Sequence, residues 1–169
     1  MDISNIKYKY LEKLPEVGEI EPNPRDAYIL QGDYAGTNSE TTAILTYVYQ
    51  SYVVRQFDED IAEVFENIAI VEMTHHKVLG DLIVSLGGDP IYAYQGRFWT
   101  GKNVGCTKNL KEMLVSNIAS EEEAIRGYLA SIDKLYSKTA IGLLEAIIED
   151  EKLHIKAFKE ILEYVTFWK

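Results

Sequence analysis

Apolar residues recur in steps of three and four along two long segments of the chain, about 58–86 and 138–165. This spacing gathers the apolar side chains on one face of an α-helix, so both segments are predicted to be helices buried along one side. The first stripe consists of Ile61, Val64, Phe65, Ile68, Val71, Val78, Leu79, Leu82 and Leu86, and the second of Leu144, Ile147, Ile148, Ile155, Phe158, Ile161, Leu162 and Val165. In both, ionisable residues fill the gaps in the middle of the stripe.

Each of these segments is preceded by another that is predicted to be helical. The first begins at the polar stretch GTNSE (36–40), where Thr37, Asn38 or Ser39 can cap a helix, and runs to about residue 56. The second spans about 108–136. The stop signal GGDP (87–90) opens a connection over 87–107 that has no helical period. No strand pattern competes with this all-α interpretation.

The links between the four helices are therefore short, long and short. Short links make two antiparallel helix hairpins, and a long second link can travel the length of a four-helix bundle. Residues 1–36 hold three of the four prolines and no sustained period, apart from a short helix allowed in RDAYILQ (25–31). We therefore expect an irregular N-terminal arm over 1–36, packed on a bundle over 37–169.

The two predicted hairpins repeat one motif. ETTAILTY (40–47) and EEEAIRGY (121–128) both fit Glu-x-x-Ala-Ile-x-x-Tyr, and each is followed about thirty residues later by Glu-x-x-His. Three residues along a helix leave two side chains about 60° apart on one face, and seven bring a tyrosine nearly over its glutamate. The inward set is Glu40, Tyr47, Glu72, His75, Glu121, Tyr128, Glu151 and His154.

Four buried carboxylates would destabilise a domain by several kcal/mol each unless cations neutralise them. Two divalent cations balance four carboxylates, and two imidazoles add nitrogen ligands. The predicted metal ligands are Glu40, Glu72, His75, Glu121, Glu151 and His154, holding two iron or two manganese ions. The alternative is a bundle with buried Glu–His hydrogen bonds and no metal.

Composition narrows the classes of partner. The chain of 169 residues has the size of one domain, with 47% hydrophobic and 26% charged residues. Its net charge of −10 argues against a nucleic acid or an anionic membrane as partner. The single Cys106 excludes an intramolecular disulfide and a Cys-x-x-Cys site within this chain. No apolar run suits a signal peptide or a membrane span, so we expect a cytoplasmic protein.

The phrases SETTAILTYVYQ, VEMTHHKVLGDLIVSLGGDP and IIEDEKLHIKAF resemble small one-domain members of the ferritin-like superfamily, grouped with rubrerythrins and manganese catalases. The resemblance covers about 37–165. It implies that Glu40 and Glu121 are terminal ligands, that Glu72 and Glu151 bridge the metals, and that each histidine binds one metal. By similarity to bacterioferritin-type sites, Tyr47 and Tyr128 would hydrogen-bond the ligand carboxylates.

The chain also departs from these families. Rubrerythrins carry another glutamate where this chain has Ala124, and a cysteine-rich rubredoxin module that is absent here. Manganese catalases typically lack a glutamate at the position of Glu151. Met73 is no clear match to the haem-binding methionine of bacterioferritins, so no haem is predicted.

Three ionisable residues lie next to predicted ligands in the sequence. Glu122 could face inward in place of Glu121, but only Glu121 obeys the repeat. His76 lies about 100° round the helix from His75, which favours a surface or inter-helix role. Asp150 could hydrogen-bond a ligand imidazole or simply be exposed, and both options stay open.

The predicted function is a non-haem dinuclear oxidoreductase of peroxidase, catalase or oxidase type, which uses hydrogen peroxide or O2. Without a cysteine-based electron carrier, either an external donor reduces the site or peroxide serves as oxidant and reductant. One alternative is a ferroxidase that feeds iron into a storage shell. Another is a structural or coat-type protein that metals only stabilise. A homo-oligomer, with a dimer favoured, is expected.

Overall fold

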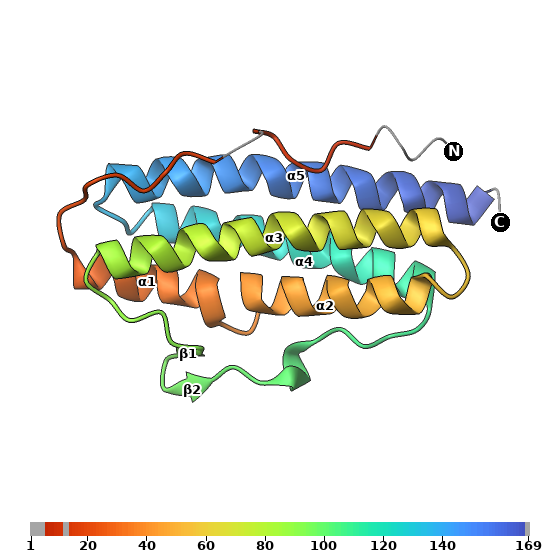
Figure 1. Cartoon of the computed structure of the whole chain (residues 1–169), viewed down its shortest axis with the longest axis horizontal. Coiled ribbons are helices and arrows are strands. Elements are labelled where there is room, and N and C mark those ends of the chain that lie inside the picture. The colour runs from red at the N-terminus through yellow and green to blue at the C-terminus, as the bar shows by residue number, and fades with distance from the viewer. Residues whose placement is uncertain (1–5, 12–13, 168–169) are drawn as a thin grey trace.

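The computed structural model describes residues 6–11 and 14–167, and it shows the predicted all-α, ferritin-like four-helix bundle. The hairpin α2 (Glu40–Val54) and α3 (Glu59–Ser85) lies beside the hairpin α4 (Leu110–Ile132) and α5 (Lys138–Phe167) (Figure 1). These bounds agree with the predicted helices to within about four residues. None of the helices, over the described ranges, is apolar and long enough to cross a membrane.

Asparagine or aspartate caps begin three of the helices. Asn23, Asp58 and Asn109 each accept a hydrogen bond from the backbone N–H three residues later, at 3.2, 3.0 and 3.1 Å. Each cap satisfies one of the N–H groups that the first turn leaves without a partner inside the helix.

The N-terminal segment is more ordered than the sequence indicated. A full helix, α1 (Pro24–Ala35), occupies the place where only a short helix was allowed. Its signals are present in the chain, because Asn23 caps it and Pro24 occupies a first-turn position that needs no N–H donor. In Figure 1, α1 and α2 follow each other along one edge of the bundle. The irregular part therefore ends at residue 23.

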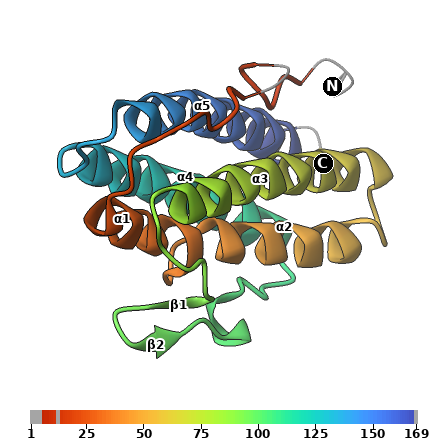
Figure 2. The same ribbon diagram turned by 60° about the vertical axis from the view of Figure 1, so that its left-hand side comes forward.

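The long crossover contains a small hairpin that the sequence did not predict. β1 (Ala93–Tyr94) and β2 (Arg97–Phe98) pair antiparallel around Gln95 and Gly96, both of which have positive φ. Figure 2 shows this hairpin on the side of the bundle away from α5. A 3₁₀ turn follows at Gly101–Asn103, and the Trp99 indole donates to Thr42 Oγ1 at 2.9 Å. The crossover thus packs on α2 through this hydrogen bond.

Two apolar clusters fill the bundle, one towards each end. Leu30, Leu79, Leu82 and Leu144 belong to one cluster, and Phe65, Met113, Leu114 and Phe158 to the other. Along α3 and α5, the Glu-x-x-His motifs lie between residues of the first cluster and residues of the second. The apolar packing that stabilises the fold therefore encloses the polar centre from both ends.

Candidate metal centre

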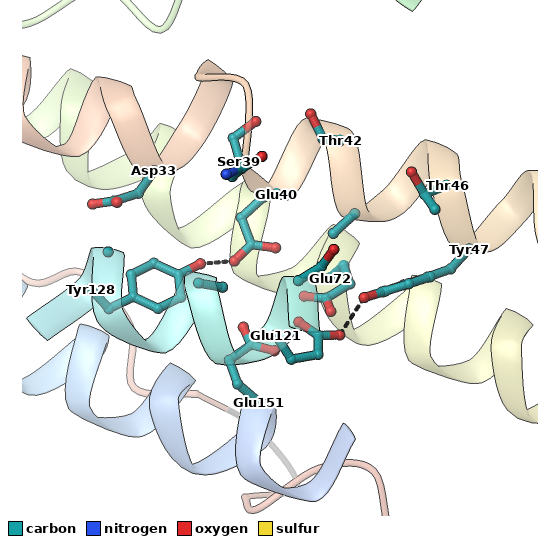
Figure 3. Close-up of a pocket in the computed structure, with 15 residues that line it drawn as sticks. Asp33, Ser39, Glu40, Thr42, Thr46, Tyr47, Glu72, Glu121, Tyr128 and Glu151 are labelled. Atoms are coloured by element: carbon teal, nitrogen blue, oxygen red, sulfur yellow. Dashed lines mark hydrogen bonds between the residues drawn. The ribbon is translucent and has the colours of Figure 1, made fainter. Parts of the chain in front are cut away.

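Six ionisable side chains from four helices meet in the middle of the bundle. Each is at most 3% exposed, and the carboxylates point towards one another (Figure 3). The six are Glu40 of α2, Glu72 and His75 of α3, Glu121 of α4, and Glu151 and His154 of α5. All the residues that the sequence singled out as ligands are therefore brought together.

These side chains form two overlapping groups, and within each group the ligand atoms lie within 4.8 Å of one another. One group is Glu40, Glu72, His75 and Glu151, and the other is Glu72, Glu121, Glu151 and His154. Glu72 and Glu151 belong to both. The geometry thus fits the predicted division into terminal and bridging carboxylates, while metal binding itself stays a prediction.

The imidazole of His75 presents Nδ1 to the cluster. This atom lies 2.9 Å from Glu72 Oε2, 3.3 Å from Glu151 Oε1 and 3.7 Å from Glu40 Oε1. One nitrogen therefore faces the two glutamates that belong to both groups and one glutamate that belongs to a single group.

The imidazole of His154 repeats this arrangement from the other hairpin. Its Nδ1 lies 2.9 Å from Glu151 Oε2, 3.1 Å from Glu72 Oε1 and 3.7 Å from Glu121 Oε1. The site is therefore close to two-fold symmetric in its inner atoms.

The outer nitrogen of each imidazole has a hydrogen-bond acceptor. His75 Nε2 lies 3.0 Å from Asp150 Oδ2, and His154 Nε2 lies 2.9 Å from the carbonyl oxygen of Tyr8. An acceptor at Nε2 keeps the proton there and leaves Nδ1 free to bind a cation. Asp150 is buried, which resolves the open choice in favour of the hydrogen bond.

Two buried tyrosines link the hairpins at the site. Tyr47 of α2 donates to Glu121 Oε1 at 2.5 Å, and Tyr128 of α4 donates to Glu40 Oε1 (Figure 3). Burial, followed by the negative charge of Glu121, raises the pKa of the Tyr47 hydroxyl well above its usual value. The hydroxyl thus stays a donor, and each tyrosine orients a carboxylate of the opposite hairpin.

Burial and mutual repulsion set the protonation of the metal-free cluster. Burial, and then the charges of Glu151 and Glu72, raises the pKa of Glu121 to about 8. Burial and Glu72 raise the pKa of Glu40 as well. Burial opposes protonation of the histidines, but the surrounding carboxylates raise their pKa well above the usual value. Without metal, protons therefore supply the compensating positive charge.

The donor set fits a pair of divalent cations. Four carboxylates and two imidazoles offer hard oxygen and borderline nitrogen ligands, which suit manganese and iron. Glu40 Oε2 is buried and makes no hydrogen bond with any residue that the structure describes. A buried carboxylate oxygen without a partner is costly, and a cation in the first group of ligands would compensate it.

A pocket connects the cluster with the space between α2 and α4. Its walls include all four clustered glutamates together with Asp33, Ser39, Thr42, Thr46 and Ser120 (Figure 3). The cavity of about 70 Å³ suits a molecule of a few atoms such as peroxide. The repeat did not predict these further lining residues, although Thr42 and Thr46 lie four residues apart on one face of α2.

The alternatives for single residues are also settled by position. Glu121 is buried, whereas Glu122 is exposed and lies 3.8 Å from Lys159 Nζ. His76 stacks on Tyr34 with ring centroids 4.2 Å apart, outside the cluster. It therefore has the inter-helix role that its place on the helix favoured.

Comparison with known proteins places the chain in a family. The family model of rubrerythrin matches residues 35–162. The probable manganese catalase of Clostridium acetobutylicum is 25% identical over 165 residues, covering 85% of this chain and 72% of the relative. The crystal structure of KatB, a manganese catalase from Anabaena, has a TM-score of 0.85 at 25% identity and covers 93% of this chain and 80% of that chain.

A second group of similar structures consists of bacterioferritins. The Mycobacterium tuberculosis bacterioferritin BfrA has a TM-score of 0.69 at 26% identity, covering 87% of this chain and 89% of that chain. The segment that the rubrerythrin family model matches contains all six clustered residues, since it begins before Glu40 and ends after His154. With its ferritin-like bundle and this family match, the chain belongs to the rubrerythrin family.

Proposed function

We propose that the six clustered residues bind two manganese or iron ions and that this centre turns over hydrogen peroxide. The observation that carries the proposal is the sharing of Glu72 and Glu151 between two groups of ligands. Glu72 and Glu151 would hold both cations, and such a pair would supply two-electron chemistry on peroxide.

The manganese catalases among the relatives favour the catalase reaction. In that reaction two molecules of hydrogen peroxide give two molecules of water and one of O2, so peroxide is both oxidant and reductant. This balance suits a chain in which no cysteine pair can carry electrons. Two bound ions would supply the reversible two-electron chemistry.

The protein's own residues have three tasks in this proposal. Glu40 and Glu121 each complete one ligand group, and the hydroxyls of Tyr128 and Tyr47 hold these carboxylates in orientation. The apolar clusters at both ends exclude bulk water, which strengthens electrostatic interactions inside. The pocket between α2 and α4 admits only a small substrate.

The test is to load the full-length protein separately with manganese and with iron, confirm two ions per chain, and follow peroxide loss and O2 release. We expect about one O2 for every two peroxide molecules consumed, by the balance above. A protein that holds two ions and releases no O2 with either metal would overturn the catalase assignment.

A ferroxidase is the second candidate, because BfrA combines 26% identity with near-complete coverage of both chains. Oxidation of added Fe(II) by O2, together with a large shell by light scattering, would favour this function. A dimer, as expected from the sequence, cannot enclose a mineral. A large rise in unfolding temperature with metal but no turnover of either kind would instead favour a purely structural role.

A further inference from the structure

The N-terminal arm lies against α5, the helix that carries the second Glu-x-x-His pair. In Figures 1 and 2 the arm follows α5 along the outside of the bundle. Ile6 and Tyr8 are partly buried and pack against the apolar cluster around Phe65 and Phe158. Farther along, Leu14 is buried in the other cluster. The arm therefore makes apolar contacts with the bundle on either side of the ligand cluster.

Two backbone groups of the arm reach the outer side of the ligand cluster. The carbonyl oxygen of Tyr8 accepts a hydrogen bond from His154 Nε2 at 2.9 Å. The N–H of Tyr10 donates to Asp150 Oδ1, while Asp150 Oδ2 lies 3.0 Å from His75 Nε2. One short stretch of arm therefore contacts the outer partners of both imidazoles.

The internal repeat explains why the arm is needed. In the second hairpin, the residue before the Glu-x-x-His motif is Asp150, and it is the acceptor for His75 of the first hairpin. The equivalent residue in the first hairpin is Val71, whose side chain has no acceptor to offer His154. The Tyr8 carbonyl takes this place, so the second histidine depends on a segment outside the bundle.

We propose that Tyr8 and Tyr10 are positioning residues of the metal centre, and that their backbone groups hold the two imidazoles with Nδ1 directed at the ions. The inference rests on the metal binding in the proposed function and identifies an additional determinant of it. It also makes the two ion positions unequal. The ion beside His75 would have an anionic outer partner, whereas the ion beside His154 would have a neutral backbone carbonyl from a segment outside the bundle.

The experiment compares Tyr10→Pro with Tyr10→Ala in the full-length protein. Proline removes the N–H group that donates to Asp150. Alanine keeps this N–H group and removes only a ring that is 52% exposed. Mn(II) affinity is measured by competition with a chelator, and bound manganese per chain by elemental analysis. We expect Tyr10→Pro to lose about 10- to 100-fold in affinity, the range for outer partners of metal ligands. Tyr10→Ala should stay within about twofold of wild type.

A second variant separates the hydrogen bond from the shape of proline. Replacing Tyr10 by its α-hydroxy acid analogue keeps the side chain and turns the N–H into an ester oxygen, so it should weaken binding in the same direction. In Co(II)-loaded protein, both variants should also speed solvent exchange of the paramagnetically shifted imidazole N–H protons. This readout does not depend on turnover.

The outcomes distinguish this inference from the proposed function. If wild type binds two ions and turns over peroxide, but both N–H variants match it in affinity and proton exchange, the role of the arm is overturned and the proposed function stands. If wild type binds two ions without turnover but the variants weaken binding, the arm is supported and the proposed function fails. A wild-type protein that binds no manganese, iron or cobalt overturns both.

Discussion

The two helix hairpins are nearly the same inside and different outside. Each contributes one glutamate, one Glu-x-x-His pair and one tyrosine, and the distances from the two Nδ1 atoms to the carboxylates agree to within 0.2 Å. The outer acceptors differ, because a buried aspartate supports one histidine and a backbone carbonyl supports the other. The clustered residues thus follow the repeat, whereas their outer hydrogen-bond partners differ between the hairpins.

The hairpins also depend on each other at the site. Tyr47 orients a carboxylate of the second hairpin, while Tyr128 and Asp150 orient ligands of the first. Neither hairpin therefore carries a complete half-site of its own. Four changes test the likeness of the two hairpins. In decreasing order of expected effect, they are substitution of the shared glutamates, a change of pH, substitution of the outer aspartate and substitution of the tyrosines.

The shared carboxylates should give the largest effect. We expect Glu151→Gln to impair both ions, because Glu151 belongs to both ligand groups, whereas Glu121→Gln should impair only the ion near His154. Metal content should fall from two ions to fewer than one in the first variant and to about one in the second. Loss of affinity should exceed the roughly 10- to 100-fold typical of outer partners.

The control for these ligand variants is Glu145→Gln, an exposed position on the same helix as Glu151. It should keep two ions and wild-type turnover. If Glu151→Gln and Glu121→Gln leave the same number of ions bound, Glu151 is not a shared ligand.

A change of pH should give the next largest effect, and it should appear in the free energy of unfolding of the metal-free protein. Folded Glu121 has a pKa of about 8, so it keeps a proton that the unfolded chain releases near pH 4.5. Stability should therefore fall as pH rises from about 4.5 to 8, and the raised pKa of both histidines adds the same sign above about 6.5. We expect a loss on the order of a few kcal/mol, measured by denaturant unfolding.

Metal-loaded protein should show the opposite trend. Cation binding requires deprotonated ligands, so acidification should release the ions and lower the unfolding temperature. A metal-free protein whose stability rises between pH 5 and 8 would show that the carboxylates are not protonated as the burial of the cluster implies.

The inner site could be predicted from the sequence because helices convert spacing into direction. The steps of three between Glu72 and His75, and of seven between Glu40 and Tyr47, place these residues on one face whatever the rest of the fold does. The repeat then indicated that two such faces oppose each other. Burial of all six residues confirms their inward direction.

The outer support could not be predicted in the same way. The groups of Tyr8 and Tyr10 that reach the site belong to the backbone, which every residue shares, and the arm has no period that fixes its register. The α1 helix is a different case, because Asn23 and Pro24 carried a start signal. The short β1–β2 hairpin depends on two residues at positive φ in a crossover without alternating polarity.

The outer aspartate should give a smaller effect than the ligands. Asp150→Asn can turn a donor towards His75 Nε2, which would move the imidazole proton to Nδ1 and oppose metal binding there. We expect a loss of about 10- to 100-fold in affinity for one ion and little change for the other. Chelator competition measures both steps, and Asp133→Asn at an exposed position is the matched control. Equal loss at both ions would contradict the unequal support of the two histidines.

The tyrosines should give the smallest effect and the best test of inner symmetry. Tyr47→Phe and Tyr128→Phe each remove one hydroxyl from a buried carboxylate of the opposite hairpin. We expect each to destabilise the protein by about 1–3 kcal/mol, the usual cost of losing a buried hydrogen bond to a charged group, with two ions still bound. Thermal unfolding and metal analysis measure this.

Since the hydroxyls occupy equivalent places, the two losses should agree to within about 1 kcal/mol, the scatter of such measurements. A large loss from one variant alone would show that the asymmetry of the outer support extends into the inner site.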